Sequence, residues 1–222
     1  MTTAIVLAAG KSERMGANVD KAFLSLVDKP ILAWSLIAFE RCPEIDRIVL
    51  VVRKDKLLAS KEVAKRYGIS KIQAIVAGGT KRQESVQAGF AACDIDTRHV
   101  VVHDAARPLV TSDVIGEVVK LAKRVPAVAV GRPMTDTVKR CEKGLQVTET
   151  VPREKLWAVQ TPQAFQVKEF RAALKALGKS EVTDYSQMVE LNGGSVRIFE
   201  SLKPNFKITT VEDLQIAGAL LK

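Results

Sequence analysis

The sequence predicts an α/β fold in which helices cover both faces of a doubly wound, mostly parallel sheet. Apolar runs of strand length alternate with helical patterns along almost all of the 222 residues. Several of these runs are nearly continuous in valine, isoleucine, leucine and alanine, as in strands that are buried on both faces. No repeat, low-complexity segment or linker interrupts the chain, so residues 1–222 are predicted to form a single domain.

The individual elements follow from these patterns in chain order. Strands are predicted at residues 4–9, 45–52, 72–77, 99–103, 127–130 and 195–199. Helices are predicted at residues 30–41, 82–93, 113–124 and 211–221. Thr80 with Gln83, and Thr210 with Asp213, have the spacing of capping boxes that begin the second and the last of these helices.

Residues 132–150 break the alternation. Short β-prone pieces flank Glu142, Lys143 and Gly144, which fit the turn of a hairpin. A hairpin at this point is not expected to join the parallel core. The pattern is typical of either a projecting arm that packs on a partner or an ordinary surface hairpin.

The composition excludes several classes of function. The net charge of +9 favours anionic ligands, but the basic residues are spread along the chain and aromatic residues are few, so nucleic acid is not an expected partner. No apolar run approaches the roughly 18 residues that span a bilayer, and the first residues lack a charged secretory leader. We therefore expect no membrane partner and a cytoplasmic location. The three scattered cysteines support neither a disulfide framework nor a zinc site.

The first strand runs into a glycine-containing turn, residues 7–16, with the sequence Leu-Ala-Ala-Gly-Lys-Ser-Glu-Arg-Met-Gly. Small residues there let the backbone approach a ligand, and Lys11, Arg14 and the later Lys21 could neutralise a triphosphate. The segment matches neither a Walker A loop nor the dinucleotide fingerprint. A tight turn with solvated charges is the alternative interpretation.

A second glycine turn follows the third predicted strand. Gly78 and Gly79 precede Arg82 and Ser85, which could contact a base or ribose at the same edge of the sheet. Taken alone, this segment fits a plain strand-to-helix connection equally well.

An acidic residue ends the fourth predicted strand. Asp104 is well placed for Mg²⁺, which prefers one or two carboxylates together with phosphate oxygens and water. Arg107 could hold a second anionic group, whereas His103 at a strand end is more typical of a structural role. Residues 150–165 are interpreted as a shaped loop, and residues 182–184 and 204–210 add further donors.

No arrangement of a serine or cysteine nucleophile with histidine is suggested anywhere in the sequence. Nucleotidyl and phosphoryl transfers need no protein nucleophile, because their catalysis consists mostly of positioning and charge neutralisation. These features together favour chemistry of that kind on a nucleotide at the edge of the sheet.

Eight short motifs, in order, resemble the 2-C-methyl-D-erythritol 4-phosphate cytidylyltransferase family of the non-mevalonate isoprenoid pathway. They are Leu-Ala-Ala-Gly with Arg-Met-Gly, Asp-Lys-Ala-Phe, Gly-Gly with Arg-x-x-Ser-Val, Val-His-Asp-Ala-Ala-Arg-Pro, Asp-Thr-Val-Lys, Val-Pro-Arg with Gln-Thr-Pro-Gln-x-Phe, Thr-Asp, and Asn-Phe-Lys-Ile-Thr-Thr. The chain departs from the family pattern at Ser12, where glycine is usual, and at Asp20, where proline is usual.

The resemblance implies a Rossmann-like nucleotidyltransferase fold that uses CTP, a small polyol phosphate and Mg²⁺, in a homodimer whose arms embrace. It implies that Arg14 and Lys21 are catalytic and that Asp104 binds the metal. The residues that it places around CTP are Ala8, Ala9, Gly10, Gly78, Arg82, Ser85 and Ala105. Those that it places around the polyol phosphate are Arg107, Thr137, Arg153, Thr161, Thr183 and Lys207, some of them from the neighbouring subunit.

Three other functions stay open at this point. A ribitol 5-phosphate cytidylyltransferase has similar motifs, although Ala106 before Arg107 and the Val-Pro-Arg stretch favour the methylerythritol substrate. A nucleotide-sugar pyrophosphorylase would use another base. A basic nucleotide-sensing or nucleic-acid-binding module would bind in a strongly salt-dependent way and release no pyrophosphate.

Overall fold

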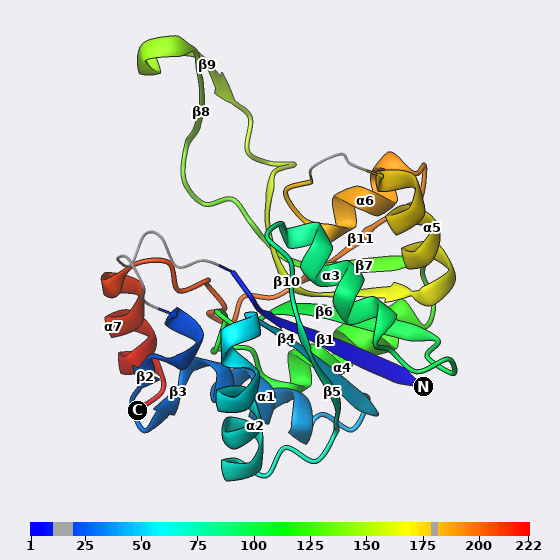
Figure 1. The fold of residues 1–222 in the computed structure, drawn as a ribbon. Coiled ribbons are helices and arrows are strands. Elements are labelled where there is room, and N and C mark those ends of the chain that lie inside the picture. The colour runs from blue at the N-terminus through cyan, green and yellow to red at the C-terminus, as the bar shows by residue number, and fades with distance from the viewer. Residues whose placement is uncertain (11–19, 179–181) are drawn as a thin grey trace.

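The computed structural model describes residues 1–10, 20–178 and 182–222. Within them, one sheet of seven strands has the order β11-β7-β10-β6-β1-β4-β5. Its strands are β1 (Thr2–Ala8), β4 (Arg47–Val52), β5 (Ile72–Ala77), β6 (His99–Asp104), β7 (Ala127–Pro133), β10 (Trp157–Gln166) and β11 (Arg197–Glu200). All six predicted strands are confirmed, and the chain has the expected α/β fold (Figure 1).

Four of the six pairings between neighbouring strands are parallel, and β10 runs antiparallel to both β6 and β7. β1 lies between β4 and β6, with Leu7 opposite Asp104 and Ala8 opposite Val52. The chain moves outward from β1 to β4 and β5, then returns to β6 on the other side. Such a reversal leaves a crevice at the carboxyl ends of the central strands, where ligands bind in open α/β sheets.

Helices cover both faces of the sheet. The core on one face contains side chains of α1 (Ile31–Arg41), α2 (Leu57–Arg66) and α4 (Ser112–Ala122). The core on the other face contains side chains of α3 (Arg82–Ala91), α5 (Val167–Leu177) and α6 (Tyr185–Leu191). The central strands are buried between the two cores, which explains their nearly continuous apolar sequences.

A third, smaller core holds the last helix against the start of the chain. α7 (Val211–Leu220) packs Ala217 against Leu26 of β2 (Ser25–Leu26), which pairs with β3 (Lys29–Pro30), and Ile208 lies in the same cluster. Figure 1 shows α7 beside β2 and β3. The Ile208 amide donates to the Ala106 carbonyl at 2.8 Å, so the segment before α7 crosses the end of β6.

The interpretation of residues 150–165 as a shaped loop is wrong for most of the segment. Trp157–Gln166 forms β10, a strand that is largely buried although it contains several polar residues. Gln163 is 1% exposed and donates to the Gln160 carbonyl, and Asn205 donates to the Thr161 carbonyl at 2.8 Å. Because internal partners satisfy these groups, the strand tolerates a composition that does not look buried.

The start of α3 also differs from the sequence-based prediction. Glu84, not Gln83, accepts from the Thr80 and Lys81 amides, at 2.8 and 3.0 Å. The capping box therefore begins at Lys81, one residue later than expected. The second predicted box is confirmed, since Thr210 and Asp213 bond each other's backbone amides.

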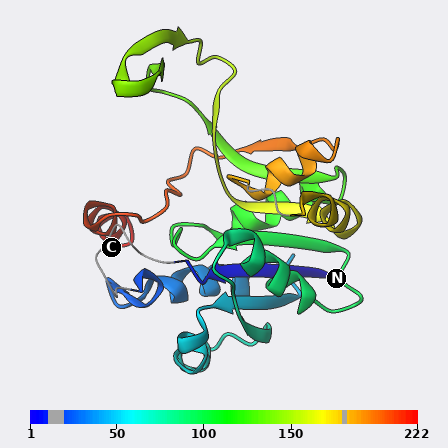
Figure 2. The ribbon, with the colours of Figure 1, turned by 45° about the horizontal axis from the view of Figure 1, so that its top comes forward.

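The predicted hairpin is present and projects from the body of the molecule (Figures 1 and 2). β8 (Val138–Cys141) pairs with β9 (Val147–Val151), and a 3-10 turn at Lys143–Leu145 joins them. Gly144 has a φ of 79°, a left-handed conformation that glycine adopts without strain. Residues 139–150 are exposed along the whole hairpin, so within one chain its side chains contribute no core.

Candidate active site

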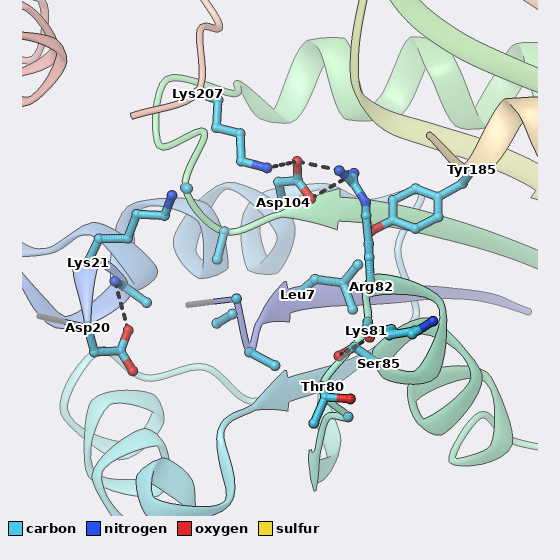
Figure 3. A pocket seen from close by; sticks show the side chains of 17 residues that line it. Leu7, Asp20, Lys21, Thr80, Lys81, Arg82, Ser85, Asp104, Tyr185 and Lys207 are labelled. Carbon is cyan, nitrogen blue, oxygen red and sulfur yellow. Dashed lines mark hydrogen bonds and ion pairs between the residues drawn. The ribbon is translucent and has the colours of Figure 1, made fainter. Parts of the chain in front are cut away.

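A cavity of about 230 Å³ opens at the carboxyl ends of β1 and β6, where the order of the strands reverses. Six separate parts of the chain contribute lining residues (Figure 3). Its lining residues are Leu7, Ala8, Ala9, Gly10, Asp20, Lys21, Ala22, Gly79, Thr80, Lys81, Arg82, Ser85, Asp104, Ala105, Ala106, Tyr185 and Lys207. The cavity thus joins the two glycine turns, the acidic strand end and the segment before α7.

The glycine pair after β5 lets two turns approach closely. A Cβ atom on Gly78 would lie 2.5 Å from the Cβ of Ala9 and 2.6 Å from the Oγ of Ser85, which is too close for any real contact. Gly78 therefore packs behind the pocket and brings β1, β5 and α3 together, while Gly79 is the glycine that lines it.

Asp104 is the electrostatic centre of the cavity. Its carboxylate accepts from Lys207 Nζ at 2.9 Å and from Arg82 Nη2 at 3.1 Å, and Arg107 Nε lies 4.0 Å away. Burial by itself would raise the pKa of this carboxyl, but the three cations outweigh burial and hold the pKa at about 2. Asp104 is therefore ionised at neutral pH.

Lys21 lies at the other side of the cavity, in a 3-10 turn formed by Lys21–Phe23. Asp20 caps this turn by accepting from the Ala22 amide at 3.2 Å, so the residue that departs from the family pattern has a structural role here. Figure 3 shows Lys21 and Lys207 both extending toward the cavity. Arg14, the other predicted catalytic residue, lies outside the described residues, as does Ser12.

The cavity brings together nine of the predicted site residues, and six others lie elsewhere. The nine are Ala8, Ala9, Gly10, Lys21, Arg82, Ser85, Asp104, Ala105 and Lys207. Gly78, Arg107 and Thr161 lie behind the lining, whereas Thr137, Arg153 and Thr183 are exposed.

Arg107 and Thr161 are bound to neighbouring backbone. Arg107 donates from Nη1 to the Asn205 carbonyl at 2.9 Å. The Thr161 hydroxyl accepts from the Asp104 amide at 3.0 Å and lies 3.1 Å from His103 Nδ1. Both residues therefore help to hold the end of β6 in place.

Two of the exposed residues belong to the base of the hairpin. Thr137 directly precedes β8, and Arg153, which follows β9, donates to the Thr135 carbonyl. Thr183 precedes α6 and donates to Gln187 through both its amide and its hydroxyl. Within a single chain these residues do not reach the cavity lining.

His103 has the structural role that its position indicated. It is completely buried, packs 5.1 Å from the ring of Phe39 and does not line the cavity. Desolvation lowers its pKa to about 3, so the imidazole is neutral and cannot act as an accessible base. Burial likewise raises the pKa of the Cys93 thiol to about 12, which makes it a poor nucleophile.

A divalent cation would find a carboxylate ligand at the end of β6. Asp104 is ionised and faces the cavity, as Mg²⁺ requires. In the described ranges, no group of three or more His, Cys, Asp or Glu side chains is arranged to hold a metal. The residues therefore fit a cation that shares its other ligands with substrate phosphate and water, and not a metal held by protein alone.

Tyr185, which no sequence pattern indicated, lines the cavity next to Arg82. It directly follows the predicted donor segment at residues 182–184, and it is one of only two tyrosines in the sequence. An aromatic residue at the start of a helix is usually part of the core, so nothing local distinguished it.

In the part of the chain that the structure describes, every helix is too short or too polar to span a membrane.

The family model for 2-C-methyl-D-erythritol 4-phosphate cytidylyltransferase matches residues 2–222. The chain belongs to this family. A cytidylyltransferase of that name from Dehalococcoides mccartyi is 43% identical over 219 residues, which cover 99% of this chain and 95% of the relative. One from Alkaliphilus metalliredigens is 39% identical, over 99% of this chain and 92% of the relative.

The fold agrees with that membership. The crystal structure of 4-diphosphocytidyl-2C-methyl-D-erythritol synthase from Anaerococcus prevotii superposes with a TM-score of 0.88 at 30% sequence identity, over 99% of this chain and 95% of that one. The chain therefore has the nucleotidyltransferase fold of the family, and family membership makes it a nucleotidyltransferase.

Proposed function

We propose that this protein transfers the cytidylyl group of CTP to 2-C-methyl-D-erythritol 4-phosphate, releasing pyrophosphate. The observation that carries the proposal is the cationic cavity around Asp104 at the reversal of the sheet, in a chain that matches the family over residues 2–222. The products are 4-diphosphocytidyl-2-C-methyl-D-erythritol and pyrophosphate. The neutral, buried His103 agrees with a mechanism that needs no protein base or nucleophile.

In the proposed step, an oxygen of the polyol phosphate attacks the α-phosphorus of CTP. The bond from that phosphorus to the oxygen bridging toward the β-phosphate breaks, and its electron pair leaves with pyrophosphate. Lys21, with Arg14, would neutralise the negative charge that gathers on the α-phosphate. The protein's contribution is thus to hold two anions in line and to lower their repulsion.

The nucleotide is proposed to bind against the two glycine turns. Ala8, Ala9 and Gly10 place backbone at the end of β1, and Arg82, Ser85 and Ala105 also line the cavity. Gly78 supports this surface by keeping β1 and α3 in contact. Small residues at these points leave room for a ligand close to the backbone.

Asp104 is the residue that would hold Mg²⁺, whose charge would screen the phosphates of CTP from the incoming phosphate. In the structure both of its oxygens accept from cations, Lys207 and Arg82. Phosphate oxygens in the cavity would offer these cations other anionic partners, and the Asp104 carboxylate could then hold Mg²⁺. The same exchange would place Lys207 against the polyol phosphate.

We further propose that the active unit is a homodimer in which the hairpin reaches the neighbouring subunit. Arg153 and Thr137 lie at the base of the hairpin and outside the cavity lining of their own chain. From a second subunit they could orient the polyol phosphate together with Arg107, Thr161, Thr183 and Lys207. Residues 132–150 would then be a dimerisation arm on a single domain.

A direct assay tests the proposed function. The protein is incubated with Mg²⁺, CTP and either 2-C-methyl-D-erythritol 4-phosphate or ribitol 5-phosphate, and pyrophosphate release is measured. We expect turnover with the methylerythritol substrate and at least tenfold lower kcat/KM with ribitol 5-phosphate. Turnover of ribitol 5-phosphate alone, or equal rates with UTP, GTP or ATP in place of CTP, would overturn the proposal.

A further inference from the structure

The guanidinium of Arg82 lies between two partners, an uncharged tyrosine and a charged carboxylate. On one side its Nε donates to the Tyr185 hydroxyl at 2.6 Å, and the Tyr185 ring centroid lies 4.4 Å from the guanidinium carbon. On the other side its Nη2 lies 3.1 and 3.3 Å from the two oxygens of Asp104. Figure 3 shows this row of three side chains along one wall of the cavity.

Tyr185 itself is firmly placed. It is 1% exposed and is the first residue of α6, whose N-cap Asp184 accepts from the Ser186 amide at 2.7 Å. The buried Gln163 of β10 fixes the same helix start, because its Oε1 accepts from the Ser186 amide at 3.0 Å. The start of α6, which carries Tyr185, is therefore anchored to the central sheet.

The neutrality of the tyrosine matters for an anionic ligand. Burial and the nearby Asp104 raise the pKa of the Tyr185 hydroxyl, so it remains uncharged and orients Arg82 without cancelling its charge. If Asp104 held Mg²⁺, its oxygens would be less available to Arg82, whose other side-chain hydrogen bond goes to Tyr185. The hydrogen bond from Arg82 Nε to Tyr185 does not involve the proposed metal ligand.

We propose that Tyr185 is a positioning residue for CTP, holding Arg82 through the Nε–Oη hydrogen bond and the ring face so that its outer nitrogens point at an anionic oxygen of the nucleotide. The inference rests on the proposed nucleotide-binding role of Arg82. Tyr185 acts through Arg82 and not by touching the nucleotide itself. Its effect should therefore appear in CTP affinity more than in the chemical step.

Tyr185→Phe tests this with the smallest change, because it removes the hydroxyl and keeps the ring. Loss of a hydrogen bond to a charged group should raise the CTP KM, and the calorimetric Kd for CTP, about tenfold. The kcat should stay within about threefold and the polyol phosphate KM within about twofold. Tyr67→Phe, the only other tyrosine substitution possible, is the matched control and should change none of these values.

A double-mutant cycle decides whether the tyrosine acts through the arginine. In an Arg82→Ala background, Tyr185→Phe should no longer weaken CTP binding. A tenfold effect that persists there, or an unchanged Kd in Tyr185→Phe alone, would overturn the proposal. Should Tyr185→Phe fail to fold, Tyr185→Leu also removes the hydroxyl, and it must weaken CTP binding in the wild-type background but not in the Arg82→Ala background for the proposal to survive.

The calorimetric readout separates this inference from the proposed function. If the protein binds CTP but does not transfer it to 2-C-methyl-D-erythritol 4-phosphate, the proposed function is wrong while the cycle still tests Tyr185. If turnover is as proposed but Arg82→Ala leaves CTP affinity unchanged, the positioning role of Tyr185 is wrong.

Discussion

The Lys207 ammonium lies 2.9 Å from the Asp104 carboxylate, although 103 residues separate the two in the chain. Asp104 ends β6, and Lys207 belongs to the segment that the third core and the Ile208–Ala106 hydrogen bond hold across that strand end. The ion pair joins the proposed metal ligand to a proposed contact of the polyol phosphate. Lys207 is therefore one of the cations that lower the pKa of Asp104.

This cluster should make stability depend on pH in the acid range. Asp104 has a pKa of about 2 in the fold, below its ordinary value of 3.8, so its contribution is present above pH 4 and is lost as the pH falls toward 2. We expect Asp104→Asn to lower the free energy of unfolding by about 1–2 kcal/mol at pH 6, given that Arg82 and Lys207 are partly exposed. The difference from wild type should shrink to near zero by pH 2.

Urea unfolding of both proteins between pH 2 and 6 measures that difference. Asp113→Asn is the control, because it removes a carboxylate whose side chain is 80% exposed and should change the unfolding free energy by less than about 0.5 kcal/mol. A difference for Asp104→Asn that is constant across the range would contradict the role of the charge.

Lys21→Ala should separate binding from chemistry. Because the proposed role of Lys21 is to neutralise charge that develops on the α-phosphate, turnover should fall by about 100-fold or more while the Kd for CTP changes by less than about threefold. Lys54→Ala, in an exposed turn outside the cavity, is the matched control. Near-normal kcat in Lys21→Ala would remove that residue from the mechanism.

Arg153 provides a test of the shared site. Arg153→Ala should raise the KM for the polyol phosphate and lower kcat by at least tenfold, with CTP binding unchanged. Asp104→Asn should be inactive by itself. Mixed dimers of the two variants contain one intact site if the arginine acts in the partner subunit.

Random mixing of these subunits should then restore about a quarter of wild-type activity, since half of the dimers carry one native site of two. Co-expressed, differently tagged subunits purified through both tags give the cleanest measurement. No recovery in the mixed dimer, or a protein that is monomeric at assay concentration, would place Arg153 in the site of its own chain or outside any site.

Gly78→Ala should damage the fold beneath the cavity. The new Cβ would lie 2.5 Å from Ala9 and 2.6 Å from Ser85, so β1 and α3 must separate, at a cost of about 1–3 kcal/mol in unfolding free energy. CTP affinity should fall as well. Gly116→Ala in α4 is the control: its Cβ would have 3.7 Å to the nearest atom, and alanine favours a helix. Equal Tm values for both variants would show that the close approach is relaxed without cost.

Sequence patterns predicted the parallel core well because buried parallel strands have an unmistakable composition. β5 (Ile72–Ala77) has the predicted bounds, and the hairpin turn falls at Gly144 as expected. β10 was missed because Gln160, Pro162 and Gln163 resemble loop residues until their buried partners are known. The helices α2, α5 and α6 were not predicted, although α5 buries Phe170 and Leu174 on one face.

The residues of the candidate site also divide into those that local sequence could predict and those that it could not. Ala8 to Gly10, Arg82, Ser85 and Asp104 could be proposed locally, because each directly follows a strand or opens the next helix, where an open α/β sheet binds ligands. Tyr185 could not, because its role depends on a contact with Arg82, which lies 103 residues earlier in the chain.

By itself the sequence determined the α/β class, the strand ends that carry small and acidic residues, the hairpin and the family motifs. These are properties of local composition and order. Only the tertiary structure decided that three cations surround Asp104, that Thr161 and His103 lie behind the site, and that Tyr185 holds Arg82. Those relationships depend on strand order and on the return of the last segment across β6. They join residues tens to a hundred positions apart, so no local pattern encodes them.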